Sequence, residues 1–214
     1  MSGPTEDIID PGQRIIDPHH HLWDRRNQLA ALPNPPTHPF QNVLRLSPRY
    51  LLDELLADMT SGHNVVATVF LECGAMYRAD GPAAMKPIGE TEFVNGVAAM
   101  SASGIYGPAR ACAGIVGHVD LMLGAKAGEV LDAHIAAGNG RFRGIRHSAS
   151  NDADPNVLGP LVRRPPAVFM DRTFREGFAQ LAPRKLSFDA WLLEPQLPDL
   201  IDLAHFLAHQ APKP

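Results

Sequence analysis

The sequence lacks the features that mark secreted, membrane and nucleic-acid-binding proteins. Its 214 residues include only two cysteines, Cys73 and Cys112, and both lie near the ends of expected strands, which favours reduced thiols over a disulfide. No run approaches the roughly 18 apolar residues of a membrane span, and residues 1–13 lack a signal-peptide pattern. The net charge is −4, with mixed signs and no basic stripe. We therefore expect a soluble cytoplasmic protein that binds neither nucleic acid nor membranes.

The most informative stretch is a short β-branched strand that ends in three consecutive histidines, RIIDPHHHLWD at residues 14–24. If extended geometry continues to residue 21, side-chain alternation places Asp17, His19 and His21 on one face. Their Cα atoms would lie roughly 7 Å apart, so two imidazoles could reach one ion at about 2.0–2.1 Å. Such a pair supplies half of a mononuclear transition-metal site. The alternative is a polar strand exit whose histidines are adjacent by chance.

The rest of the chain reads as alternating strands and helices. Residues 1–13 form an expected flexible leader, and residues 14–210 form the expected domain. Five prolines in residues 25–48 predict that most of this span lacks regular structure. Ser47 and Pro48 then predict the start of a helix that Gly62 ends. The later strands are predicted at 65–71, 112–119, 141–146 and 186–191, and the later helices at 90–103, 126–137, 173–182 and 198–208.

This alternation indicates a parallel α/β fold, either an open doubly wound sheet or a closed (β/α)8 barrel. Long loops follow the strands, at 25–47, 73–89 and 147–170, whereas the loops after helices are short, as at the catalytic face of a barrel. No glycine-rich nucleotide-binding turn follows the first strand. We expect a TIM barrel of which only the first five βα units are present, because eight units of this size would need about 320 residues. The chain is thus expected to be truncated at its C-terminus.

The motif Asp17-x-His19-x-His21-x-Trp23-Asp24 resembles the amidohydrolase superfamily. More narrowly, it is similar to the amidohydrolase family 2 branch of metal-dependent TIM-barrel hydrolases, which includes dicarboxylate and sugar lactonases and some decarboxylases. Later stretches resemble the same branch, and the similarity runs from about residue 14 to about residue 208. These stretches are VFLEC at 69–73, GIVGHVDL at 114–121, RFRGIRH at 141–147 and LSFDAW at 186–191.

The resemblance implies one divalent metal ion, with zinc as the expected ion. His19 and His21 match the first pair of ligands in that family. The family's acid–base Asp comes from the eighth strand and a further His often comes from the sixth, so both would lie beyond residue 214, and the catalytic residues are unknown. Some lactonases of this branch work without metal, using the same histidines to polarise a carbonyl, and the sequence leaves that alternative open.

Polar residues on the expected strands and on the loops that follow them form the predicted substrate-binding set: Glu72, Tyr77, Arg146, His147 and Asp189. Arg146 or its neighbour His147 is expected to face the pocket, where a guanidinium would bind a carboxylate. Glu72 could orient a metal-bound histidine. Asp189 lies in an apolar run, where a carboxylate needs a partner.

The function expected from these residues and from the resemblance is hydrolysis. A metal-activated water would open a small lactone or a similar carboxylated cyclic ester. The alternatives are a metal-dependent decarboxylase on the same scaffold and a non-catalytic truncated product that serves as an association module. The expected partner is a small-molecule substrate. Further copies of the chain, in a homo-oligomer, are the second kind of partner considered.

Overall fold

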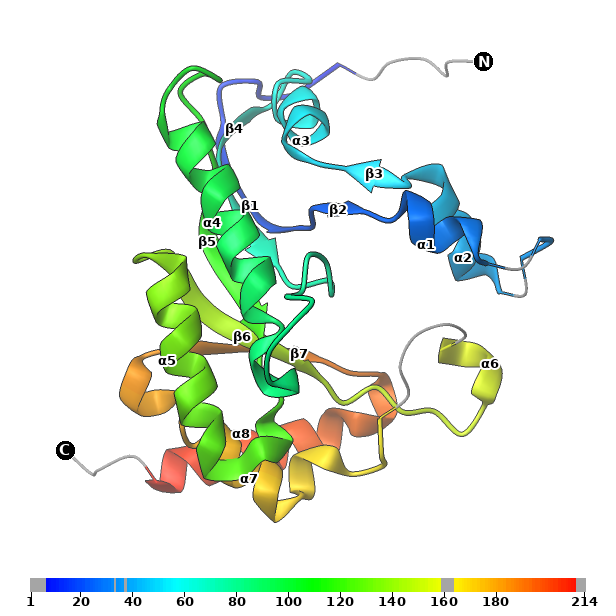
Figure 1. The fold of residues 1–214 in the computed structure, drawn as a ribbon, viewed down its shortest axis with the longest axis vertical. Helices are drawn as coiled ribbons and strands as arrows, with labels where there is room; N and C mark the ends of the chain where they lie inside the picture. The colour runs from blue at the N-terminus through cyan, green and yellow to red at the C-terminus, as the bar shows by residue number, and fades with distance from the viewer. Residues whose placement is uncertain (1–6, 33, 37, 159–163, 211–214) are drawn as a thin grey trace.

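The central element is a parallel sheet of five strands whose order in space matches their order in the chain, β1-β4-β5-β6-β7 (Figure 1). The structure is a computed structural model, and it describes residues 7–32, 34–36, 38–158 and 164–210. The sheet strands are β1 (Arg14–His20), β4 (Asn64–Leu71), β5 (Arg110–His118), β6 (Phe142–Ser148) and β7 (Ser187–Trp191). A separate antiparallel pair joins β2 (Trp23–Asp24) to β3 (Arg49–Tyr50).

Helices follow each sheet strand and connect it to the next. The α-helices are α1 (Arg26–Ala30), α2 (Pro39–Leu46), α3 (Leu52–Met59), α4 (Ile88–Ala102), α5 (Ala127–Gly138), α6 (Pro155–Leu158), α7 (Arg172–Phe178) and α8 (Leu197–Gln210). Short 3-10 helices are η1 (Ala83–Met85), η2 (Leu121–Lys126), η3 (Val168–Met170), η4 (Ala182–Arg184) and η5 (Glu194–Gln196). Among the described residues no helix is long and apolar enough to cross a membrane.

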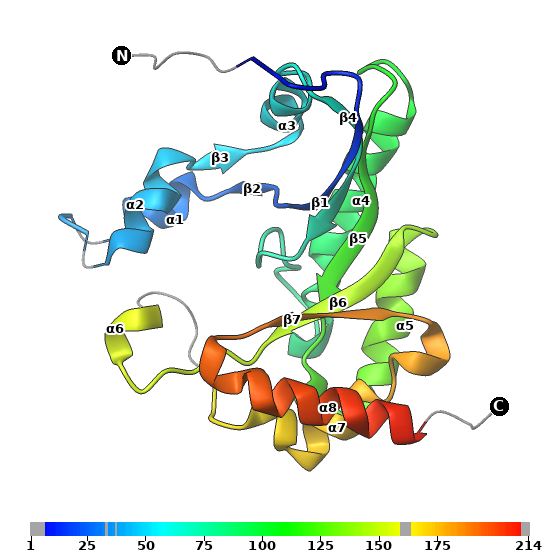
Figure 2. The same ribbon diagram turned by 180° about the vertical axis from the view of Figure 1, so that it is seen from behind.

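The sheet curls, and its helices cover one face of it. Figure 2 shows α4 and α5 running along β5 and β6, with α7 and α8 next to β7. Parallel strands need such crossover helices, and the curl gives a mixed α/β half-barrel rather than a flat open sheet. All five carboxyl ends therefore lie along one edge, where the long connecting loops also begin.

The hydrophobic core lies between the sheet and these helices. Phe70, Ile115 and Ile145 are fully buried on this face. Phe174 and Phe178 of α7 meet Phe188 of β7 with ring centroids 6.3 and 5.0 Å apart. Each such buried side chain contributes about 1.5–3 kcal/mol of transfer free energy. This face therefore holds the sheet and helices together.

The opposite, concave face of the sheet has much less cover. Ile16 of β1 is 62% exposed and Trp191 of β7 is 38% exposed. Both strands are outermost in the sheet, so each has one neighbouring strand among the described residues. Apolar side chains and strand edges are thus open to solvent at both ends of the sheet.

The predicted strands and most predicted helices are confirmed to within a few residues, with three corrections. The helix expected from Ser47 and Pro48 begins instead at Leu52, because the preceding residues pair with β2, and Glu54 caps it by accepting from the N–H of Leu51 at 2.8 Å. The proline-rich span holds α1 and α2, since Pro39 occupies the first position of α2, where its missing N–H costs nothing. The helix expected at 173–182 ends at Phe178.

Candidate functional site

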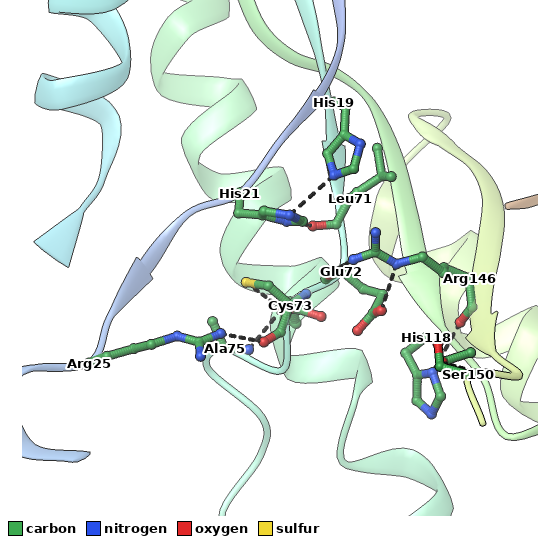
Figure 3. A network of polar contacts seen from close by, with 12 residues as sticks. His19, His21, Arg25, Leu71, Glu72, Cys73, Ala75, His118, Arg146 and Ser150 are labelled. Carbon is green, nitrogen blue, oxygen red and sulfur yellow. Dashed lines mark hydrogen bonds and ion pairs between the residues drawn. The ribbon is translucent and has the colours of Figure 1, made fainter. Parts of the chain in front are cut away.

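His19 and His21 converge at the carboxyl end of β1. Their Nε2 atoms lie 3.2 Å apart, and the rings meet nearly at a right angle (Figure 3). Two imidazole nitrogens bound to one tetrahedral zinc at about 2.0–2.1 Å would be roughly 3.3 Å apart. The pair therefore already has the separation of two ligands on one ion.

The backbone fixes which nitrogen of His21 carries the proton. Nδ1 of His21 lies 2.8 Å from the carbonyl oxygen of Leu71, which can only accept, so Nδ1–H donates and Nε2 keeps its lone pair. Burial, together with the nearby Arg146 and His19, lowers the pKa of His21 to about 4. His21 is therefore neutral near pH 7, which is the form that binds a metal ion.

Asp17 does not join the histidines, so the expectation that all three share a face is wrong. The pairing of β1 with β4 shifts between Asp17 and His20, which breaks the alternation of side chains. The Asp17 carboxylate instead accepts from the N–H of His19 at 3.0 Å. A bulge of this kind cannot be read from the spacing of residues in a sequence.

The pair supplies two ligands, fewer than a catalytic zinc site uses. Within the part of the chain that the structure describes, no three His, Cys, Asp or Glu side chains are grouped closely enough to hold a metal ion. His118 ends β5 at the same edge, but its Nδ1 lies 3.1 Å from the carbonyl oxygen of Arg146. A metal centre at His19 and His21 therefore needs ligands from outside these residues.

Arg146 faces the concave side of the sheet and forms an ion pair with Glu72. Its Nε donates to Oε1 of Glu72 at 2.9 Å, and Nη2 donates to the Glu72 carbonyl (Figure 3). The two side chains are only 8% and 16% exposed. The guanidinium carbon lies 5.2 Å from the ring centroid of Trp191, within the range of a cation–π contact. The orienting contact to His21, expected from Glu72, comes instead from the carbonyl of Leu71.

His147 faces the opposite side of the sheet from Arg146. Its ring packs edge-on against Phe174 of α7, with centroids 5.2 Å apart, and the residue is 2% exposed. Of the two residues that were expected to face the pocket, Arg146 is therefore the one that lies beside the histidine pair. His147 lines a separate cavity on the helix-covered side.

Asp189 and Tyr77 complete the predicted set. Asp189 pairs in register with Arg146, so both side chains project from the same face of neighbouring parallel strands. Asp189 is half-buried, and no hydrogen bond or ion pair holds its carboxylate among the described residues. Tyr77 is 38% exposed. Burial and the nearby Glu90 and Glu72 raise the pKa of Tyr77, so its hydroxyl stays protonated and can donate.

Glu90 of α4 is a site residue that the sequence did not reveal. It is 2% exposed, and its Oε1 accepts from the N–H groups of Cys73 at 3.0 Å and Ala75 at 2.8 Å. Arg25 donates to the carbonyl of Cys73 at 2.7 Å, so the segment after Glu72 is held from two sides. Burial raises the pKa of Glu90 to about 7. A single acidic residue in the first turn of a helix normally lies in solvent, so nothing in the sequence pattern marks Glu90 as buried.

Comparison with known proteins gives the following matches. No family model matches the chain. The uncharacterized protein y4mH of Sinorhizobium fredii is 32% identical over 195 residues, which cover 89% of this chain and 57% of that protein. A crystal structure of a Burkholderia multivorans amidohydrolase with bound HEPES is similar with a TM-score of 0.52 and 25% identity, over 89% of this chain and 53% of that one. A zinc-bound crystal structure of a B. multivorans amidohydrolase is similar with a TM-score of 0.51 and 25% identity, over 91% of this chain and 53% of that one.

The chain spans little more than half the length of the relatives that it matches. The curled parallel sheet, the histidine pair at the end of β1 and the likeness to the two amidohydrolase structures agree with one another. The lactonase-like branch is not distinguished by any of these matches. The structural neighbours thus support an amidohydrolase-related family for this chain.

Proposed function

We propose that the protein containing this chain is a metal-dependent hydrolase that opens a small lactone or a similar carboxylated cyclic ester. In this proposal residues 14–210 supply the first five βα units of a (β/α)8 barrel. The observation that carries the proposal is the convergence of His19 and His21, with Nε2 atoms 3.2 Å apart and the lone pair of His21 fixed by the Leu71 carbonyl. The zinc bound in the B. multivorans amidohydrolase supports a divalent ion in this role.

His19 and His21 would hold the ion, which when bound would polarise an ester carbonyl and lower the pKa of a water molecule. The other residues of the site act on the substrate. Arg146 is fixed by Glu72, so its remaining N–H donors keep a constant position for a substrate carboxylate. Asp189 offers an unpaired carboxylate to a substrate hydroxyl, and Tyr77 offers a protonated hydroxyl.

Neither a decarboxylase nor a non-catalytic association module has a specific observation in its favour. The half-barrel itself does not distinguish them from a hydrolase, because a fold alone does not select a reaction. The proposal therefore depends on the chemistry of the histidine pair.

The test is hydrolysis by the longest reading frame that contains this chain, purified and supplied with Zn²⁺ or Mn²⁺. Opening of a lactone releases a proton, which an indicator dye records across a panel of sugar and dicarboxylate lactones. We expect turnover of at least one lactone that falls at least about a hundredfold in His19→Ala and in His21→Ala. His63→Ala is the matched control, because His63 is exposed and lies outside the site. Metal-replete protein that hydrolyses no lactone, or an unaffected His19→Ala variant, would overturn the proposal.

A further inference from the structure

A cavity lies on the helix-covered side of β6, away from the histidine pair. Its volume is about 430 Å³, and the segments after β5 and β6 form its walls. Its lining includes Asp120, Met122, His147, Arg164, Val168 and Met170. Because His147 faces Phe174 while its neighbour Arg146 faces Glu72, the body of β6 separates this cavity from the candidate metal site.

Arg164 is the unusual residue of this cavity. Its Nε is buried and has no hydrogen-bond partner, and no described residue forms an ion pair with its guanidinium. Other partly buried arginines of the chain are paired, as Arg146 is with Glu72 and Arg184 is with Asp132. A charged group that lacks an acceptor within the protein favours an anion from outside, which would meet the guanidinium N–H groups other than the buried Nε–H.

The acidic residues of the lining already have partners. Oδ1 of Asp171 accepts from the N–H groups of Thr173 and Phe174 at 2.7 and 3.1 Å. Oδ1 of Asp120 accepts from the N–H of Met122 at 3.0 Å. Each carboxylate thus stabilises the start of a helix, where backbone N–H groups favour negative charge. Neither of them neutralises Arg164.

His147 adds no charge to the cavity. Its Nδ1 accepts from the N–H of Leu121 at 3.1 Å, which fixes the ring. Burial, together with the nearby His118 and Arg164, lowers the pKa of His147 to about 4, so the ring is neutral near pH 7. Among the described lining residues, Arg164 is therefore the one positive charge, and the two carboxylates each hold the start of a helix through Oδ1.

We propose that this cavity binds a small organic monocarboxylate, with the carboxylate on Arg164 and the apolar part against Met122, Val168 and Met170. A guanidinium presents a planar fork of N–H donors that matches a carboxylate. The apolar lining favours an organic anion over an inorganic one. The volume lies within the range of about 300–1,000 Å³ that is usual for small-molecule sites. The site does not depend on the proposed hydrolase reaction.

The test uses the methionines as reporters of binding. In the chain labelled with methyl-¹³C methionine, Met122 and Met170 report on the cavity, and Met100 of α4 is an exposed control at 46%. Phenylacetate is the probe, phenylacetamide is its uncharged isostere, and sulfate is the inorganic anion. We expect saturable shifts of Met122 and Met170, but not Met100, with phenylacetate, and binding at least about tenfold weaker for the amide and for sulfate.

Arg164→Gln should weaken phenylacetate binding at least about tenfold. Arg172→Gln is the matched control, because the side chain of Arg172 is 93% exposed and its partner among the described residues is Glu176. If Arg164→Gln alters the methionine spectrum without ligand, Arg164→Lys, which keeps the charge and loses the fork, takes its place. Absence of shifts with phenylacetate, equal binding of the amide or of sulfate, or unchanged binding in both Arg164 variants would each overturn the proposal.

Discussion

Arg146 of β6 donates from Nε to Oε1 of Glu72, 2.9 Å away at the end of β4, and so connects two strands that flank β5. The contact therefore spans the carboxyl end of β5, which lies between these two strands. The Arg146 guanidinium also lies 5.2 Å from the ring of Trp191 on β7. The ion pair and the contact with Trp191 thus fix the relative positions of the ends of β4, β6 and β7, and the ion pair lies beside His19 and His21 (Figure 3).

The first prediction concerns this ion pair. Glu72→Gln should lower the free energy of unfolding by about 2–4 kcal/mol, because it leaves the guanidinium of Arg146 nearly buried without its counter-charge. The double variant with Arg146→Met should lose much less than the sum of the single losses. Urea unfolding of the four proteins measures this coupling. The exposed pair Arg78 and Glu92, with side chains 42% and 48% exposed, is the control and should couple by less than about 1 kcal/mol. Equal coupling in both pairs would contradict the prediction.

The second prediction is that buried histidines destabilise the chain in acid. Burial lowers the pKa of both His134 and His147 to about 4. Between that value and the ordinary pKa near 6.5, the unfolded chain binds more protons than the folded chain, so stability falls as the pH is lowered through this window. Urea midpoints between pH 4 and 7 should show this fall, and His134→Gln should make it shallower. An exposed control, His63→Gln, should leave the slope unchanged.

The third prediction concerns Glu90, whose titration changes stability with pH in the direction opposite to that of the buried histidines. Its folded pKa of about 7 lies above the ordinary value of 4.5, so the folded chain binds the extra proton between these two values. The contribution of Glu90 to stability is therefore present below about pH 4.5 and is lost as the pH rises to about 7. Glu90→Gln keeps an acceptor for Cys73 and Ala75 but cannot ionise. The variant should gain stability relative to the parent between pH 5 and 8, and a constant difference across that range would refute the assignment.

The fourth prediction concerns the concave face of the sheet. Ile16 and Trp191 are exposed on the two outermost strands, and exposed apolar edges favour pairing with another chain. The 214-residue chain should therefore bind an apolar dye and form oligomers in size-exclusion chromatography. Ile16→Lys should reduce both signals, whereas Ile105→Lys, at a loop residue that is 84% exposed, should not. A monomer that binds no dye would contradict this prediction.

The sheet and the histidine pair were predictable from the sequence because local patterns determine them. Val65 to Leu71 is a continuous β-rich run, and such runs form strands that are covered on both faces when parallel. His19 and His21 lie two residues apart, so an extended backbone brings their side chains to one face. Neither feature depends on a distant part of the chain.

The remaining features depend on contacts between distant residues. Arg49 and Tyr50 form a strand because Trp23 and Asp24, far away in the sequence, pair with them. Irregular pairing also decides which side chains face the site: after a register shift, the Asp17 carboxylate accepts from the N–H of His19 and does not join the two imidazoles. Glu90 was missed because its burial comes from the loop that packs over α4.

The measurement that tests the account most directly is metal binding by the histidine pair. The chain, freed of metal by a chelator, is titrated with Co²⁺ and followed by its visible absorption, and zinc is measured by elemental analysis after dialysis. We predict weak, reversible binding with less than one ion retained per chain, because two imidazoles are fewer ligands than a catalytic zinc site has. The double variant His19→Ala/His21→Ala should bind none at this site, and His63→Ala should bind as the parent does. One tightly held ion per chain after dialysis, or binding that persists in the double variant, would contradict the account.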